Sequence, residues 1–271
     1  MITQAYSGAM TSQGGGVSHP PLAAEWALAD EVGAMNFAFA IVSALVARNN
    51  NNGEGQLLET SQLGAMISFQ AGGWHNIARV VHDGQMRDDG MPPYNRTPMQ
   101  TSYQCGDGRW LVINPANWAQ WEQVCHTLGR DDLLRDIRGI TMFTPPSKRE
   151  KNKGWLKDQL TEHFRASSKS RDELVNILRQ AGVFCGPVLS YAELIDQPHV
   201  WKNGYLVEVE HPRLGRKTAF GNPIVFHRTP ASVPPAAPEL GEHTAQILTE
   251  MGFTGEDQAR FVEDGVTKSK L

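Results

Sequence analysis

The longest apolar pattern in the chain, residues 30–48, predicts a single helix. Its large apolar side chains fall on almost every side of the helix, and they are Met35, Phe37, Phe39, Ile41, Val42, Leu45 and Val46. A helix that is apolar all round needs protein on most of its sides, so we expect this one to be covered. Its apolar part, 37–47, is shorter than the roughly 20 residues that cross a bilayer. We therefore expect a buried helix and no membrane.

After this helix, segments of helical and of strand periodicity alternate. Residues 61–70 predict a short helix, and a connector follows at about 72–98, where glycine and proline interrupt regular structure. The turn Cys105-Gly106-Asp107-Gly108 lies between two runs of strand-forming residues, 101–103 and 110–113, which together predict a β-hairpin.

The rest of the chain continues the alternation. In order, the pattern predicts a helix at 118–128, helices opening at the capping boxes Ser170–Glu173 and Ser190–Glu193, strands at 183–189 and 205–210, a turn at 212–215 and a final helical pair at about 242–263. In the first of these helices we interpret the aromatic stripe as core; its members are Trp118, Trp121, Val124, Cys125 and Leu128. Alternating helices and strands are typical of the α/β class.

Composition excludes several classes of function. The chain has 271 residues, 40% hydrophobic and 20% charged, with a net charge of −4, so no broad basic surface for nucleic acid is expected. Its three cysteines, Cys105, Cys125 and Cys185, are widely spaced and form no CxxC pair. This spacing indicates a reducing compartment and no metal site. Since the first residues do not resemble a signal peptide, we expect a cytoplasmic protein.

Asp30 is the candidate functional residue, because it stands at the start of the long apolar helix. The positive end of a helix dipole favours an ionised carboxylate, and such a carboxylate can act as an oxygen nucleophile that accepts an acyl group. Aspartate is also a preferred helix N-cap, so a purely structural role explains the same position. The residues alone leave both alternatives open.

Several segments resemble the family III CoA transferases, the family of formyl-CoA:oxalate CoA transferase, carnitine CoA-transferases and α-methylacyl-CoA racemase. The resemblance spans essentially the whole chain, in the order of the family. The matching segments are Ala29-Asp30 followed by the apolar helix, Gly53-Glu54-Gly55-Gln56, Cys105-Gly106-Asp107-Gly108-Arg109-Trp110-Leu111-Val112-Ile113, Ala181-Gly182-Val183-Phe184-Cys185-Gly186-Pro187-Val188, Gly204-Tyr205-Leu206-Val207-Glu208-Val209, Gly221-Asn222-Pro223-Ile224 and Pro238-Glu239-Leu240-Gly241-Glu242-His243-Thr244.

The resemblance implies that Asp30 is the catalytic nucleophile of an acyl-CoA:carboxylate CoA transferase. Its carboxylate would form an acyl-aspartyl anhydride and then an aspartyl-CoA thioester, from which an acceptor carboxylic acid takes the CoA. The coenzyme A thioester would be a substrate, with no metal and no permanently bound cofactor. An acyl-CoA and a small carboxylic acid are therefore the expected partners.

Two alternatives remain beside the transferase. The first is an α-methylacyl-CoA racemase or epimerase, in which Asp30 would move an α-proton; the second is a non-catalytic subunit or truncated remnant. The racemase branch needs a histidine whose position would fall before Met1. Other candidate residues carry weaker signals, namely His75 and His82 as acid or base, Trp74, Met91 and Tyr94 as acyl-pocket residues, Glu31 as a helix charge, and Glu242 with His243 as a local polar cap.

The resemblance also implies a fold, an interlocked dimer of large and small α/β domains. We expect part of the large domain at 1–90, a small α/β domain at 91–225 and a C-terminal return to the large domain at 226–271. Family members carry a Rossmann-like half that supplies most CoA contacts, and we expect this chain to lack it and to need a chain that carries it. Without it, a lone monomer should expose apolar surface. The family's mobile glycine-rich loop has no clear match at 88–98, and Gly14-Gly15-Gly16 is expected to form a flexible turn.

Overall fold

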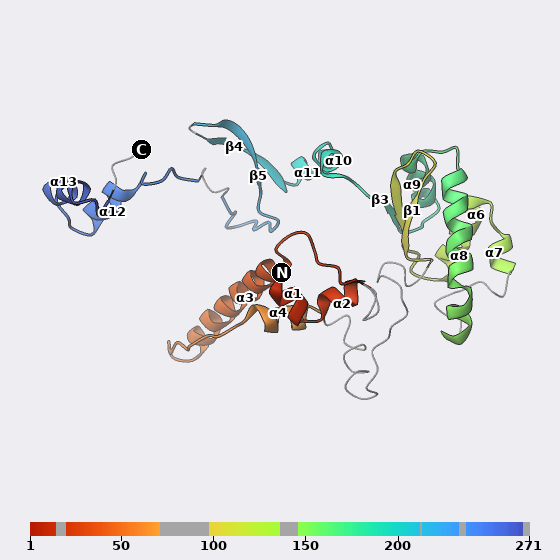
Figure 1. Ribbon diagram of the computed structural model, residues 1–271, viewed down its shortest axis with the longest axis horizontal. Coiled ribbons are helices and arrows are strands. Elements are labelled where there is room, and N and C mark those ends of the chain that lie inside the picture. Colours follow the sequence, from red (N-terminus) through yellow and green to blue (C-terminus); the bar gives the residue numbers. More distant parts are fainter. Residues whose placement is uncertain (15–19, 71–97, 136–145, 212, 233–236, 268–271) are drawn as a thin grey trace. The chain divides into compact units, whose positions relative to one another are not determined.

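The computed structural model describes residues 1–14, 20–70, 98–135, 146–211, 213–232 and 237–267 (Figure 1). It divides the chain into two compact units, Met1–Val188 and Leu189–Leu271. Both units contain helices and strands, and both sheets pair antiparallel. The mixed helix-and-sheet class is thereby confirmed. The predicted domain limits at 90 and 225 stay a prediction.

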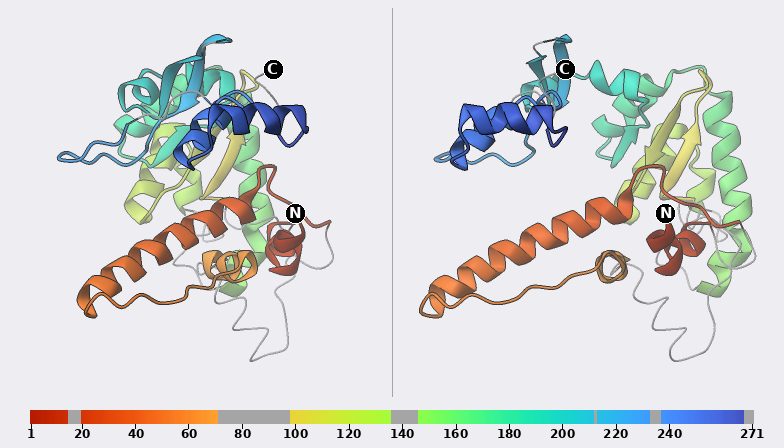
Figure 2. Two further views of the ribbon diagram at one scale, coloured as in Figure 1. Left: turned by 90° about the vertical axis from the view of Figure 1, so that its left-hand side faces the viewer. Right: turned by 60° about the vertical axis from the view of Figure 1, so that its left-hand side comes forward.

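The N-terminal part is helical. Its elements are α1 (Ile2–Tyr6), α2 (Ala9–Gly14), α3 (Leu28–Asn50) and α4 (Gln62–Phe69). In both views of Figure 2, α3 is one long helix and the chain returns beside it to α4, against which it packs. The Ser61 hydroxyl accepts a hydrogen bond from the Gly64 amide and so caps the start of α4. The helices predicted at 30–48 and 61–70 are both confirmed.

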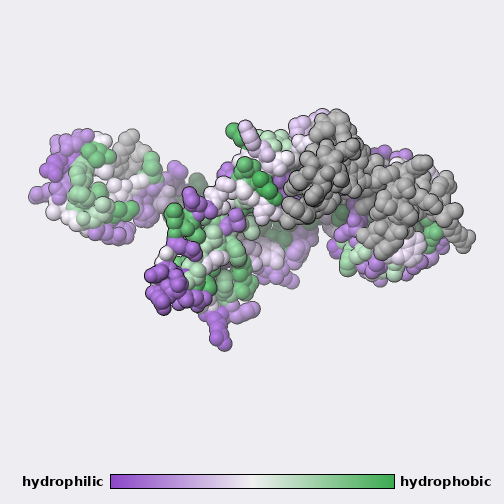
Figure 3. All heavy atoms as spheres, turned by 90° about the horizontal axis from the view of Figure 1, so that it is seen from below, coloured by the Kyte–Doolittle hydropathy of each residue, from purple (hydrophilic) through white to green (hydrophobic). Residues whose placement is uncertain are grey.

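The expected cover over α3 is absent from the described part of this chain. Ala29 is the one buried residue among the positions of α3, whereas Met35 is 73% and Phe39 is 74% exposed. Figure 3, seen from below the view of Figure 1, shows hydrophobic side chains at the surface where α3 lies. The prediction of a buried helix is therefore wrong for the chain by itself, because its own segments reach only a small part of the helix. The accompanying expectation, that a lone monomer exposes apolar surface, agrees with these exposures.

The length of α3 also corrects the argument against a membrane span. The 23-residue helix Leu28–Asn50 is long and apolar enough to cross a bilayer, and it is the one such helix among the described residues. The apolar run 37–47 is shorter than this helix, because the helix extends beyond the run at both ends. Length and composition alone do not separate a span from the core helix of a protein assembly.

A small sheet with four helices forms a second group of elements. The strands are β1 (Thr101–Gln104), β2 (Trp110–Ile113) and β3 (Cys185–Pro187), and the helices are α6 (Trp118–Leu128), α7 (Asp132–Arg135), α8 (Pro146–Ala166) and α9 (Arg171–Gln180). Strand β2 is central and pairs with both neighbours, with Tyr103 opposite Leu111 and Val112 opposite Gly186. The hairpin is confirmed, whereas the strand predicted at 183–189 is only three residues long.

One apolar core joins this sheet to its helices. Helix α8 packs on β1, and α9 packs on β2 and β3. The Tyr103 and Phe164 rings stack with 5.0 Å between their centroids, and Trp121 is fully buried beside them in the core cluster. This confirms that the stripe of α6 is core. Helix α6 ends where predicted, because Gly129 takes the left-handed conformation with φ of 66°.

The second compact unit has little core of its own. Its elements are α10 (Tyr191–Ile195), α11 (Pro198–Lys202), β4 (Leu206–His211), β5 (Gly215–Phe220), α12 (Thr244–Glu250) and α13 (Gly255–Glu263). The capping boxes at Ser170 and Ser190 both form, as predicted. The final helical pair is also confirmed. Among the described residues of this unit, Val200 is the one buried hydrophobic side chain.

Candidate active site

Asp30 lies in the first turn of α3 but does not cap it. The N-cap residue is Ala27, which makes no side-chain cap bond, and the Asp30 amide donates to the Ala27 carbonyl oxygen at 2.9 Å. The proposed capping role is therefore wrong. As the third helical residue, Asp30 still lies within the reach of the positive end of the helix dipole, and its side chain is exposed.

The Asp30 carboxylate is held by a side chain from α4. Gln62 Nε2 donates a hydrogen bond of 2.7 Å to Asp30 Oδ1. Gln62 is the first residue of α4, so the packing of α4 on α3 brings the amide to the carboxylate. Within the described residues this is the one hydrogen bond made by the carboxylate.

A further contact determines which end of the Gln62 amide faces Asp30. Thr3 Oγ1, from α1, donates to Gln62 Oε1 at 3.2 Å. With the oxygen engaged by a hydroxyl, the amide nitrogen points to the carboxylate. Gly33 contributes space, because a Cβ at that position would lie 3.3 Å from Gln62 Cγ. Three helices thus meet at one carboxylate.

Two further amide side chains, a buried one and a half-buried one, support the same helices. Gln4 is 2% exposed, and its Oε1 accepts a hydrogen bond of 3.0 Å from the Ala24 amide. Gln70 Nε2 donates to the carbonyl oxygens of Ser7 and Met66. These bonds connect α1, α4 and the segment that leads into α3. The sequence pattern predicted none of them, and the bonds of Gln4 to Ala24 and of Gln70 to Ser7 join residues far apart along the chain.

The remaining sequence candidates do not join this site. Glu31 follows Asp30 in the first turn and is exposed, as expected of a helix charge. Glu242 accepts a bond of 2.7 Å from the Glu239 amide, which fits the predicted polar cap, while His243 precedes α12 without a side-chain cap bond. Five other candidates lie outside the described residues, namely His75, His82, Trp74, Met91 and Tyr94.

The three cysteines are free thiols that are buried or half-buried, as structural cysteines are. Burial raises the pKa of Cys105 to about 11 and the pKa of Cys125 to about 12, so both thiols stay protonated and unreactive near neutral pH. Cys185 is half-buried, and its Sγ lies 3.6 Å from the Val175 carbonyl oxygen. Among the described residues, no group of three or more His, Cys, Asp and Glu side chains could hold a metal ion.

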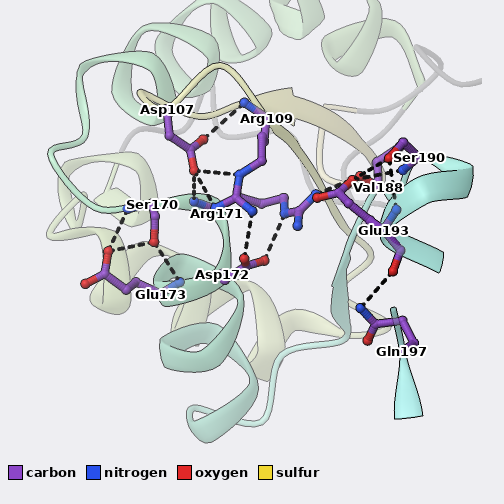
Figure 4. A network of polar contacts seen from close by, with 10 residues as sticks. All are labelled: Asp107, Arg109, Ser170, Arg171, Asp172, Glu173, Val188, Ser190, Glu193 and Gln197. Carbon is purple, nitrogen blue, oxygen red and sulfur yellow. Dashed lines mark hydrogen bonds and ion pairs between the residues drawn. The ribbon is translucent and has the colours of Figure 1, made fainter. Parts of the chain in front are cut away.

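The turn of the hairpin forms a separate polar network (Figure 4). Asp107 accepts hydrogen bonds from the Arg109 side chain at 3.0 Å and from the Arg171 amide at 2.9 Å. Arg109 also pairs with Asp172 at 2.9 Å, and the buried Arg171 donates to the Val188 carbonyl oxygen. These bonds attach the hairpin turn to the start of α9, so the matching segment Cys105–Arg109 has a structural role.

The geometry and the comparisons together define the class of protein. The family model of CoA-transferase family III matches residues 1–244, and the chain belongs to this family. Among its curated relatives is the formyl-CoA:oxalate CoA-transferase of Rhodopseudomonas palustris, 25% identical over 266 residues that cover 91% of this chain and 60% of the relative. The protein of the same name from Afipia carboxidovorans is 25% identical over 257 residues, covering 88% and 58%.

Solved structures show the same fold. A CaiB/BaiF family protein from Brucella suis matches with a TM-score of 0.71 and 23% identity, covering 92% of this chain and 62% of that one. Rv3272 from Mycobacterium tuberculosis matches with a TM-score of 0.68 and 22% identity, covering 90% and 62%. The family III fold is thereby confirmed. The chain spans about 60% of the length of the curated relatives that it matches.

Proposed function

We propose that this chain carries the nucleophile of an acyl-CoA:carboxylate CoA transferase, and that the nucleophile is Asp30. The observation that supports it best is the setting of Asp30, an exposed carboxylate at the positive end of α3 that is oriented by Gln62. Family membership supplies the reaction class. The acyl-CoA donor and the small carboxylic acid acceptor belong to the same proposal.

The proposed reaction exchanges acyl groups without a change of oxidation state. An oxygen of Asp30 attacks the thioester carbon, the carbon–sulfur bond breaks, and CoA thiolate leaves from an acyl-aspartyl anhydride. The thiolate then attacks the aspartyl carbonyl carbon and releases the donor acid, which leaves an aspartyl-CoA thioester. The acceptor carboxylate attacks the aspartyl carbonyl carbon of this thioester, the carbon–sulfur bond breaks, and CoA thiolate leaves from a second anhydride. Attack of the thiolate on the acceptor carbonyl finally yields the new acyl-CoA and free Asp30.

The start of α3 suits these steps electrostatically. Each attack places negative charge on a carbonyl oxygen next to the first turn of the helix, and the positive dipole end stabilises charge there. Glutamine cannot exchange a proton as an acid or base, and it is the described partner of Asp30. Racemisation would need a second proton-transfer group besides Asp30, and Gln62 does not supply one.

We further propose that other protein covers α3. Met35 and Phe39 lie four residues apart on one side of the helix and are both largely exposed. Burial of such side chains contributes about 1.5–3 kcal/mol each, which is a strong drive to associate. A second copy, as in an interlocked dimer, or the polypeptide that binds CoA would provide this cover. The proposed domains 1–90, 91–225 and 226–271 and a cytoplasmic location complete the proposal.

The test is covalent capture at Asp30. The complete gene product that carries this chain is incubated with acyl-CoA and hydroxylamine, and the peptide around Asp30 is analysed by mass spectrometry. We expect a hydroxamate at Asp30, and we expect Asp30→Asn to lower transfer by about 10⁴-fold or more because the nucleophile is lost. Glu31→Gln is the matched control, since it removes the neighbouring carboxylate.

Three outcomes separate the functions. Loss of transfer in Asp30→Asn, with activity kept in Glu31→Gln, supports the transferase. Deuterium at the α-carbon of a chiral 2-methylacyl-CoA in deuterated water, without an acceptor acid, would indicate the racemase instead. A complete assembly that gives neither an Asp30 adduct nor α-deuterium would contradict any catalytic role.

A further inference from the structure

We propose that Gln62 is a positioning residue that holds the Asp30 carboxylate in the orientation for attack; the inference rests on the proposed nucleophilic role of Asp30. The matching segments of the family resemblance do not include Gln62. Its assignment comes from the contact between α3 and α4, where Gln62 Nε2 lies 2.7 Å from Asp30 Oδ1.

The hydrogen bond is short and its donor is constrained at several points. Ser61 caps α4 and so defines where the helix begins at Gln62. The Thr3 hydroxyl engages Gln62 Oε1, which keeps the amide nitrogen directed at the carboxylate. Gly33 leaves room for the Gln62 side chain to lie against α3. The donor is thus placed by three helices before any substrate arrives.

Orientation matters because the two carboxylate oxygens have different tasks. An aspartate side chain in solution rotates about χ1 and χ2, and each rotation moves the attacking oxygen by ångströms. A bond from Gln62 to Oδ1 restricts these rotations and leaves Oδ2 available to attack. Misplacement of a reacting group by about 1 Å can lower the rate about 100-fold.

A neutral donor is suited to this task. Lysine or arginine at the same place would pair with Asp30 and stabilise its charge, which would lower its reactivity. An amide orients the carboxylate through one directed bond and leaves the full negative charge on it. The same amide nitrogen could also donate to the carbonyl oxygen of the acylated aspartate after each transfer, although more weakly than to the carboxylate.

The first test compares two substitutions in the complete assembly. Gln62→Leu keeps volume but removes the donor, and we expect kcat to fall about 10- to 100-fold while KM for acyl-CoA stays nearly unchanged. Asn36→Ala is the matched control. It removes another side-chain bond between the same segments, from Asn36 Nδ2 to Thr60 Oγ1 at 3.4 Å, without touching Asp30.

A second variant separates positioning from support of the fold. In Gln62→Glu the new carboxyl group donates to Asp30 only when it is protonated, and it repels Asp30 when it is ionised. We therefore expect activity relative to wild type to rise as pH falls from 8 to 5. A structural role would not produce this pH profile. Circular dichroism at each pH verifies that the variants remain folded.

The outcomes distinguish this inference from the proposed function. If wild type forms an Asp30 adduct and Gln62→Leu forms it at the wild-type rate, Gln62 does not position Asp30 although the transferase stands. If Gln62→Leu and Asn36→Ala lose activity equally, and Gln62→Glu shows no rise at low pH, the role of Gln62 is structural and the inference fails. If wild type forms no adduct, both proposals fall together.

Discussion

The sheet region and the helix that carries Asp30 use their apolar residues in opposite ways. Among the described residues of 98–188, many large apolar side chains pack in one core, and Leu111, Trp121 and Phe164 are completely buried. In α3 comparable side chains such as Met35 and Phe39 remain about three-quarters exposed. The first region therefore contains its own source of stability. The second has apolar side chains that the described part of its own chain leaves exposed, which is consistent with the proposal that further protein covers it.

The contrast extends to the polar contacts. The hairpin turn is attached to α9 by the cluster of Asp107, Arg109, Arg171 and Asp172. Asp30 is attached to α4 by one amide, and this contact is exposed. A structural carboxylate is surrounded by donors that neutralise it, whereas a nucleophilic carboxylate must keep its charge available. The number of donors around each carboxylate is thus consistent with the role proposed for it.

The largest effect on stability is expected in the sheet region. Phe164→Ala removes a fully buried ring that stacks on Tyr103, so we expect the free energy of unfolding to fall by about 3–5 kcal/mol. Denaturant unfolding followed by circular dichroism measures this loss. Phe164→Leu is the control, and it should recover much of the stability because it refills most of the volume. A loss below about 1 kcal/mol would show that this core can collapse around the cavity and is less rigid than its packing indicates.

A smaller effect, of another kind, is expected on α3. Phe39→Glu places a charge in the middle of the exposed apolar face, and we expect it to weaken association by roughly 2–4 kcal/mol. Sedimentation equilibrium of the complete gene product measures the shift, and Phe39→Leu serves as the apolar control. Unchanged association of Phe39→Glu would mean that this face is not covered by protein, and a membrane surface would then explain the apolar helix better.

The sequence predicts the helix ends of both regions well, but it misses one whole helix of the sheet region. Caps and turns depend on residues a few positions apart: Ser61 and Ser170 mark the starts of predicted helices, and Gly129 marks the end of one. Helix α8 was not predicted, although Leu156, Leu160 and Phe164 repeat every four residues and form its buried stripe. The first half of α8 is rich in lysine, so the apolar content of the whole segment is low and does not indicate the stripe.

The candidate site was predicted only in part, for a physical reason. Asp30 is recognisable because a carboxylate at the start of an apolar helix is a local pattern, and the family resemblance adds a role. Gln62 lies 32 positions further on and Thr3 belongs to a helix too short to show a period. Their contacts arise from the packing of α1, α3 and α4. A single sequence carries no local signal for such a meeting of helices.

The smallest predicted effect is the pH dependence of the sheet region. Burial opposes ionisation of Asp107, but hydrogen bonds from Arg171 and Arg109 outweigh it and hold the pKa of its carboxyl below the ordinary value. A carboxylate with a lowered pKa stabilises the fold above its unfolded pKa of about 3.9, and the contribution is lost as pH falls through the lower, folded value. Asp107→Asn should therefore cost about 1 kcal/mol at pH 7 and less below pH 4. Unfolding measured at pH 7 and at pH 3 checks the difference, and an equal loss at both would mean that Asp107 contributes its shape and not its charge.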